Sequence, residues 1–192
     1  MSDDTPATFF ACAPLVLVVM GVSGVGKTTI AKGLADELGW AFEEGDLLHP
    51  KANVDKMAAG HPLTDEDRAP WLARIAEWVD TRIAAGESGI ITCSALKRRY
   101  RDTIAHGGRS ALFVFLDGPH DTVGERLASR QGHFMPPSLL DSQFEALEPP
   151  GPDEPALRFD VGPPPQEIVA TILRKLVDTR RIAGSRSPCN PP

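Results

Sequence analysis

The sequence predicts an α/β protein with a doubly wound, five-stranded parallel sheet. Two observations carry this prediction. Short apolar runs, typical of buried parallel strands, alternate along the chain with segments of helical periodicity. The first run, at about 15–20, leads into a glycine-rich segment and then a helical pattern, the setting in which phosphate-binding loops occur.

The glycine-rich segment matches the phosphate-loop pattern G-x-x-x-x-G-K-[ST] at every fixed position. Its glycines let the backbone curl so that N–H groups point at phosphate oxygens, and the following helix adds its dipole. We expect Lys27 to reach the β- and γ-phosphates of ATP and the Thr28 hydroxyl to ligate Mg²⁺. The alternative, a glycine-rich helix N-terminus that binds nothing, leaves Lys27 without a function. The candidate nucleotide-binding residues are Gly21, Val22, Ser23, Gly24, Val25, Gly26, Lys27, Thr28 and Thr29.

Length and charge bound the class of protein. The 192 residues suffice for one domain with a sizeable core, expected over residues 15–182. A net charge of −6 argues against non-specific nucleic-acid binding, which needs a basic face. Three widely spaced cysteines, Cys12, Cys93 and Cys189, fit neither a disulfide framework nor a zinc site. They favour a reducing, cytoplasmic compartment.

The apolar stretch 9–20 superficially resembles the core of a signal peptide. Asp3 and Asp4 precede it in place of a basic flank, and it is too short to span a bilayer. We therefore expect no membrane association, a loose leader over residues 1–14 and a disordered tail over 183–192.

The helices and strands of the first half are predicted from hydrophobic periodicity and from the glycine and capping residues at their ends. A helix is expected at about 27–38, ended by Gly39, and a short strand at about 40–43. A short helix follows through 53–57. Thr64 and Asp67 form a capping box that starts a long helix, which Gly86 breaks. A third strand is expected at 89–93, with residues 94–97 opening another helix.

The second half continues the alternation. The nearly pure apolar run 111–116 is typical of a central parallel strand. A helix through Val123 and Leu127, a glycine-containing stretch 131–137 and a helical stretch ending at Leu147 form a candidate lid, about 126–147. A fifth strand is expected at 157–161, and a final helix carries an apolar stripe over 168–177.

Candidate acceptor-site residues follow the second and third strands, at the edge where ligands bind in open α/β sheets. Asp46 could accept a proton from an attacking hydroxyl, or it could be a helix cap or a solvated acid. Glu44 could assist Mg²⁺ through water. Arg68, which lies further along the chain beside Pro70-Trp71, could hold an anionic substrate, although a surface helix position is the commoner fate of arginine. Ser94 and Lys97 point toward the same edge.

Two arginines and two histidines complete the candidates. Arg126 and Arg130 lie four apart on one helix face, the layout of a lid whose arginines stack on adenine and contact phosphate. A pair of solvated helix arginines is the alternative. His49 lies near Asp46 and could form a hydrogen bond with substrate, and it forms no metal cluster with His133.

Several longer segments carry a more specific pattern than the phosphate loop. They are Glu44-Gly45-Asp46-Leu47-Leu48-His49-Pro50, Asn53 to Met57, Pro62 to Leu72, Cys93 to Asp102, Gly132-His133-Phe134-Met135-Pro136 and Gln143-Phe144-Glu145-Ala146-Leu147-Glu148-Pro149. With the loop, they resemble the small bacterial-type gluconokinases over about residues 15–180. The leader and the tail depart from the family pattern and put nothing catalytic in doubt.

The resemblance implies a P-loop kinase fold like that of shikimate and nucleoside monophosphate kinases, with a closing lid. It implies transfer of phosphate from ATP to D-gluconate with Mg²⁺, giving 6-phospho-D-gluconate for the pentose phosphate or Entner–Doudoroff route, and usually a homodimer. By the same resemblance Lys27 and Asp46 are catalytic, Arg126 and Arg130 are lid arginines, and Arg68 holds the substrate. The weaker substrate-binding candidates are His49, Lys56, Ser94, Lys97 and His133.

Two other functions stay open on the sequence. Another small P-loop kinase would act on shikimate or a nucleoside monophosphate. A regulator would bind ATP without transferring phosphate, and it would release no ADP in response to an acceptor.

Overall fold

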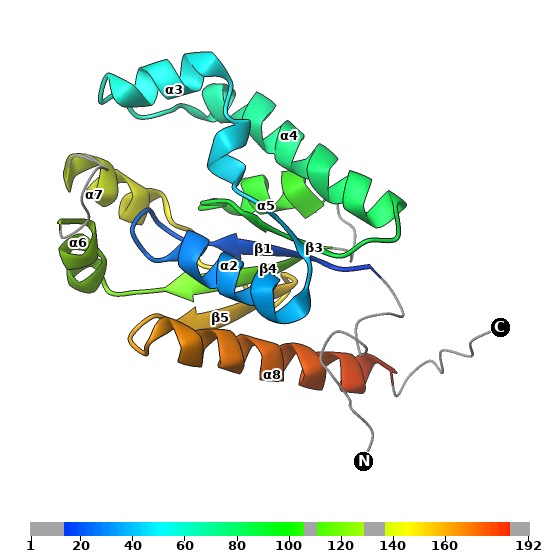
Figure 1. Cartoon of the computed structure of the whole chain (residues 1–192). Coiled ribbons are helices and arrows are strands. Elements are labelled where there is room, and N and C mark those ends of the chain that lie inside the picture. Colours follow the sequence, from blue (N-terminus) through cyan, green and yellow to red (C-terminus); the bar gives the residue numbers. More distant parts are fainter. Residues whose placement is uncertain (1–13, 106–110, 129–136, 185–192) are drawn as a thin grey trace.

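The computed structural model describes residues 14–105, 111–128 and 137–184 (Figure 1). Five parallel strands form one sheet in the order β2-β3-β1-β4-β5, which confirms the predicted fold class. The strands are β1 (Val16–Met20), β2 (Ala41–Glu43), β3 (Gly89–Thr92), β4 (Ala111–Asp117) and β5 (Ala156–Asp160). The helices are α2 (Lys27–Leu38), α3 (Lys51–Ala58), α4 (Asp65–Ala84), α5 (Arg98–Ala105), α6 (His120–Ala128), α7 (Pro137–Ala146), α8 (Pro165–Gly184) and the short 3₁₀ helix η1 (Gly45–Leu48).

Strand β1 lies in the middle of the sheet and is buried on both faces. Val19 pairs with Thr92 of β3 on one side and with Val114 of β4 on the other. Because side chains alternate along a strand, Leu17 and Val19 pack into one core layer while Val16, Val18 and Met20 pack into the other. This explains why β1 reads in the sequence as an uninterrupted apolar run.

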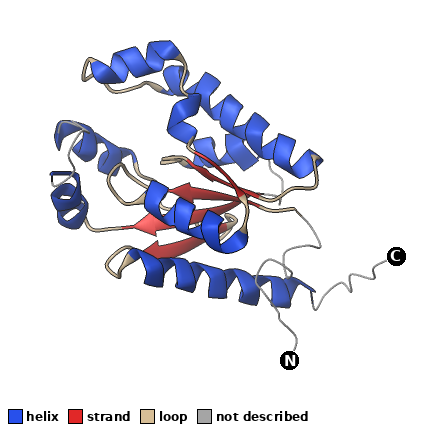
Figure 2. Cartoon of the chain, viewed as in Figure 1, coloured by secondary structure: helices blue, strands red, loops and turns tan. Residues whose placement is uncertain are grey.

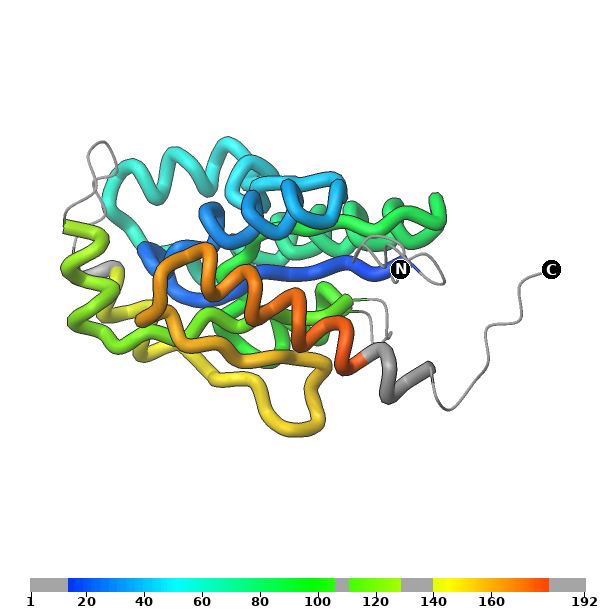
Figure 3. Tube along the Cα trace, turned by 60° about the horizontal axis from the view of Figure 1, so that its bottom comes forward, coloured from blue at the N-terminus to red at the C-terminus, as the bar shows by residue number. Residues whose placement is uncertain are grey.

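Helices cover both faces of the sheet (Figure 2). Helices α2 and α8 lie side by side on one face (Figures 1 and 3), where a Cβ at Gly33 would stand 3.0 Å from a Val169 methyl. Helices α4 and α5 cover the other face, with Trp71, Ile75 and Ile104 fully buried. Within the described ranges, no helix is long and apolar enough to cross a bilayer.

The segment after β3 differs from its prediction. Residues 94–97 do not open a helix, because α5 begins only at Arg98 and Ala95 has a left-handed φ of 43°. The buried Arg101 guanidinium holds this conformation by donating to the carbonyl oxygens of Ala95 (3.0 Å) and Leu96 (3.3 Å). Arg101 also pairs with the buried Glu154 at 2.5 Å, so the charge is compensated. The segment therefore leaves the sheet as non-helical backbone.

Candidate active site

The phosphate loop follows β1 at the carboxyl edge of the sheet. Gly21, Gly24 and Gly26 all have positive φ, and a Cβ at Gly21 would stand 2.7 Å from the Leu116 carbonyl oxygen. The Lys27 ammonium donates to the carbonyl oxygens of Gly21 (3.1 Å) and Val22 (3.0 Å), which places its charge inside the curl. Helix α2 starts without a side-chain cap, so none of its first N–H groups is taken by a capping side chain. The loop thus has the geometry and charge that nucleotide phosphates require.

A carboxylate connects the phosphate loop to two neighbouring strands. Glu44, just after β2, accepts hydrogen bonds from the Thr28 hydroxyl (2.8 Å) and from the Thr92 hydroxyl at the end of β3. Hydroxyl and carboxylate oxygens are the ligands that Mg²⁺ takes beside nucleotide phosphates and water. In the ranges that the structure covers, no group of three or more His, Cys, Asp or Glu could hold a metal alone. Thr28 and Glu44 thus supply oxygen atoms of the kind that a nucleotide-bound Mg²⁺ takes.

Asp46 is presented by η1, which is braced at its first residue, Gly45. The Gly45 N–H donates to Thr92 Oγ1 at 3.1 Å, and the Gly45 carbonyl accepts from the Trp71 indole N–H at 2.7 Å. A Cβ at Gly45 would stand 1.9 Å from the Thr92 carbonyl oxygen, so only glycine fits this contact. Asp46 itself is exposed, and no described residue hydrogen-bonds to or pairs with its carboxylate. A braced neighbour and an unengaged carboxylate suit a proton acceptor.

His49 is held as a neutral imidazole beside Asp46. Its ring stacks on Trp71, with 4.1 Å between the ring centroids, and its Nδ1 lies 3.3 Å from the Asn53 side-chain nitrogen. That nitrogen donates to the Asp67 carbonyl at 2.7 Å and is therefore the amide NH₂, so Nδ1 accepts and Nε2 carries the hydrogen. Burial lowers the pKa of His49 to about 4, against the opposing charge of Asp46. His49 can thus donate from Nε2 without carrying a charge.

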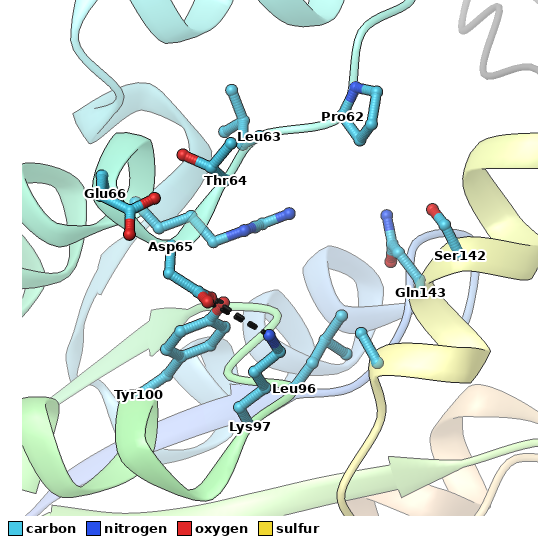
Figure 4. A pocket seen from close by; sticks show the side chains of 12 residues that line it. Pro62, Leu63, Thr64, Asp65, Glu66, Leu96, Lys97, Tyr100, Ser142 and Gln143 are labelled. Atoms are coloured by element: carbon cyan, nitrogen blue, oxygen red, sulfur yellow. Dashed lines mark hydrogen bonds and ion pairs between the residues drawn. The ribbon is translucent and has the colours of Figure 1, made fainter.

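A cavity of about 290 Å³ opens between the start of α4, the segment after β3 and α7 (Figure 4). Arg68 and Lys97 both line it. Lys97 is paired with Asp65 at 3.2 Å, whereas the Arg68 guanidinium contacts the Tyr100 ring at 6.0 Å and has no ion pair with any described residue. Arg68 is therefore the cavity cation that is available to an anionic ligand.

The Asp65 carboxylate accepts several hydrogen bonds on this wall of the cavity. It accepts from the Tyr100 hydroxyl and from Arg99 in addition to Lys97. The Tyr100 hydrogen bond, followed by the cations, lowers the pKa of Asp65 to about 2. Burial and the Asp65 carboxylate together raise the pKa of Tyr100 to about 12. Asp65 therefore stays ionised and competes with any ligand for Lys97.

The buried thiol of Cys93, just after β3, feels the charges of three predicted site residues. Burial raises the pKa of Cys93 to about 12, and the charges of Asp46, Lys27 and Arg68 all act on the same thiol. These residues come from η1, the phosphate loop and α4, which are far apart in the sequence. Lys27, Asp46 and Arg68 are therefore all close enough to the end of β3 for their charges to act on the Cys93 thiol.

The other predicted residues that the structure describes have partners of their own or lie outside the cavity. Lys56 pairs with Asp67 at 2.5 Å, beside the predicted capping box with Thr64, and Thr29 is exposed on the first turn of α2. The Ser94 carbonyl accepts from the Gly21 N–H at 3.3 Å, and Arg126 donates to the Val161 carbonyl at 2.7 Å. Arg130 and His133 lie outside the described residues. The ligand roles of all these residues stay predictions.

Four residues at the site have no assigned role in the sequence interpretation: Thr92, Asp65, Tyr100 and Gln143. Thr92 is a polar residue at the end of an otherwise apolar strand, which was a usable signal. Asp65 and Tyr100 meet over 35 positions of sequence, so only the fold brings them together. Gln143 lies in a segment that carries the family resemblance, but its hydrogen-bond partner, the Ser23 N–H, is 120 positions away and cannot be predicted from the neighbouring sequence.

Comparison with known proteins agrees with this geometry. The family model described as an AAA domain matches residues 16–150. A gluconokinase of Gluconobacter oxydans is 51% identical over 161 residues, which cover 84% of this chain and 90% of that protein.

Two solved structures are also similar. A sugar kinase from Janibacter sp. HTCC2649 has a TM-score of 0.81 and 52% identity, covering 85% of this chain and 94% of that one. A gluconokinase from Sinorhizobium meliloti 1021 has a TM-score of 0.79 and 44% identity, covering 88% and 97%. With the phosphate loop in place, this similarity shows that the chain belongs to the gluconokinase family.

Proposed function

We propose that the chain transfers the γ-phosphoryl group of ATP to the 6-hydroxyl of D-gluconate, giving ADP and 6-phospho-D-gluconate. The observation that carries the proposal is the Arg68 guanidinium, which lines a cavity beside the phosphate loop without a carboxylate partner among the described residues. A bidentate contact with a ligand carboxylate would satisfy it. The names of the similar gluconokinases support gluconate as the ligand that supplies this carboxylate.

In the proposed reaction Asp46 acts as the general base. Its carboxylate takes the proton of the 6-hydroxyl while the hydroxyl oxygen forms a bond to the γ-phosphorus. The bond from that phosphorus to the bridging oxygen breaks, and ADP leaves with the bonding electron pair. The exposed, unengaged carboxylate of Asp46 and the braced Gly45 before it support this role.

Lys27, Thr28 and Glu44 serve the nucleotide side. Lys27 would exchange its bonds to loop carbonyls for bonds to the β- and γ-phosphates. Thr28 and Glu44 would hold Mg²⁺, which when bound neutralises charge on those phosphates. His49 would donate from its neutral Nε2 to a substrate hydroxyl, because its Nδ1 is already engaged.

A homodimer and a cytoplasmic location also belong to this proposal. The family resemblance supports the first, and the absence of a disulfide-like cysteine pattern supports the second. Light scattering on the purified protein tests the dimer, for which we expect twice the 20.7 kDa mass of the chain.

The function is tested by coupled ADP release with ATP and Mg²⁺, using D-gluconate, shikimate, glucose and AMP as parallel acceptors. We expect ADP formation with gluconate and little with the others. Demonstrable ATP binding without gluconate-dependent ADP release would contradict the proposal. Turnover of shikimate or AMP instead would identify another small kinase, and no turnover with any acceptor would favour a regulator.

A further inference from the structure

Gln143 on α7 connects the phosphate loop with the cavity that Arg68 and Lys97 line, which we call the acceptor cavity. Its Oε1 accepts a hydrogen bond from the Ser23 backbone N–H at 2.7 Å, across 120 positions of sequence. The same side chain lines the cavity that contains Arg68 and Lys97. The proposed reaction assigns no role to Gln143, although it occupies the boundary between the two substrates' sites.

The bond to Ser23 determines which way the carboxamide faces. An N–H can only donate, so the atom facing Ser23 is the carbonyl oxygen, and the NH₂ group points away from the loop. Figure 4 shows Gln143 extending from α7 on the side of the cavity opposite Asp65 and Tyr100. In the described part of the chain, no acceptor engages this NH₂ group. Gln143 therefore offers two neutral donors to the cavity.

The two cations that line the cavity differ from Gln143 in what they can bind. Lys97 is held by Asp65, and the Arg68 guanidinium suits a carboxylate. A neutral amide donor suits a neutral hydroxyl oxygen instead. Because Gln143 also holds Ser23 at the phosphate loop, the hydroxyl that it meets is one near the transferred phosphate.

We propose that Gln143 is a specificity-determining residue that donates from Nε2 to a hydroxyl oxygen of the polyol acceptor while its Oε1 holds the Ser23 N–H. One side chain then sets the distance between the acceptor and the phosphate loop. The inference rests on the proposed function, since it takes a polyol acid as the acceptor.

The test compares Gln143→Glu and Gln143→Ala with the wild type, and uses Glu145→Gln as the matched control. Glu145 is exposed on the same helix, so the control changes α7 without touching the cavity. For each protein, kcat and the KM for D-gluconate are measured by ADP release, and the Kd for ATP by calorimetry.

Gln143→Glu is the decisive variant. It keeps an oxygen for the Ser23 N–H but replaces the two donors by an acceptor that carries a negative charge. We expect the KM for gluconate to rise about 10- to 100-fold, with the Kd for ATP within about threefold of the wild type. We expect Gln143→Ala to raise the KM about 5- to 20-fold, and Glu145→Gln to leave all three constants unchanged.

A role limited to bracing the loop gives a different result. Gln143→Glu would then match the wild type in KM, because the bond to Ser23 survives, and this outcome overturns the inference. A weakened Kd for ATP with an unchanged KM would also overturn it. If the wild type itself does not phosphorylate gluconate, the proposed function is wrong, and the inference, which depends on it, is overturned as well.

Discussion

The phosphate loop and the acceptor side of the site are held in place by different means. The loop is shaped by glycines with positive φ and by backbone hydrogen bonds, such as that from the Val25 N–H to the Val22 carbonyl oxygen at 3.4 Å. The acceptor side is shaped by side chains from several elements, including Trp71 on Gly45 and Asp65 on Tyr100. A local pattern can therefore specify the first, whereas only the assembled fold specifies the second.

The largest effect is expected on the loop side, for Lys27→Ala. Because the loop curl depends on glycines and backbone bonds, the fold should survive while the charge for the phosphates is lost. We expect kcat to fall about 10³-fold or more, measured by ADP release at saturating substrates. An unchanged thermal midpoint by circular dichroism is the control. A large loss of stability would show that the lysine, and not the backbone, shapes the loop.

Asp46→Asn is the corresponding test on the acceptor side. The amide is isosteric but cannot accept the hydroxyl proton, so we expect kcat to fall about 10²- to 10⁴-fold. The Kd for ATP should not change, since Asp46 lies after β2 and outside the phosphate loop. A kcat close to that of the wild type would remove Asp46 from the role of base.

Arg68 tests whether the acceptor side recognises charge. A neutral sugar forfeits the carboxylate contact and leaves the guanidinium unpaired, so the wild type should prefer gluconate to glucose by tens to thousands-fold in kcat/KM. Arg68→Ala should lose most of this preference while glucose turnover changes little. Arg68→Lys should keep only part of it, because an ammonium cannot make the bidentate contact. Equal wild-type turnover of the two substrates would refute the role.

Trp71→Phe tests the bracing of η1 directly. Phenylalanine keeps most of the packing and the stacking on His49 but loses the hydrogen bond to the buried Gly45 carbonyl. We expect the free energy of unfolding to fall by about 1–2 kcal/mol in urea titrations. Gluconate turnover should fall with an unchanged Kd for ATP. A weaker affinity for ATP together with the fall in gluconate turnover would show that the phosphate loop and the acceptor side depend on the same contacts.

The last effect is a pH dependence of the stability that His49 adds on the acceptor side. The pKa of His49 is about 4 in the folded protein and 6.5 as its ordinary value, so the unfolded chain binds the extra proton between these values. Protonation of His49 therefore does not lower the free energy of unfolding above about pH 6.5, and lowers it progressively as the pH falls toward 4. Urea titrations from pH 7 to 4 should show this decline, and His49→Gln should flatten it. Carboxyl groups with a lowered pKa, such as Asp65 and Glu154, lose their stabilising contribution as the pH falls through and below their ordinary values of 3.8 and 4.5, at the acid end of this range.

The same division explains what the sequence could predict. Alternating apolar and helical segments and the glycine pattern were enough for the sheet, for β1 and for the phosphate loop. Asp46 became a candidate because it follows the second strand at the ligand-binding edge, and Arg68 because of the family resemblance; the roles of both stay predictions. The non-helical conformation of residues 94–97 was not predictable, because Arg101 and Glu154 impose it from outside the segment. For the same reason the pairing of Lys97 with Asp65 could not be anticipated.

The position of Trp71 gives the acceptor site a built-in optical signal. Its indole is buried, donates to Gly45 beside the proposed base and stacks on His49, so a change at either neighbour alters the surroundings of the ring. The chain has two other tryptophans, Trp40 and Trp78, which are only partly buried. Emission from a buried indole is blue-shifted relative to an exposed one. Acceptor binding should therefore be readable from the short-wavelength part of the intrinsic fluorescence, without any label.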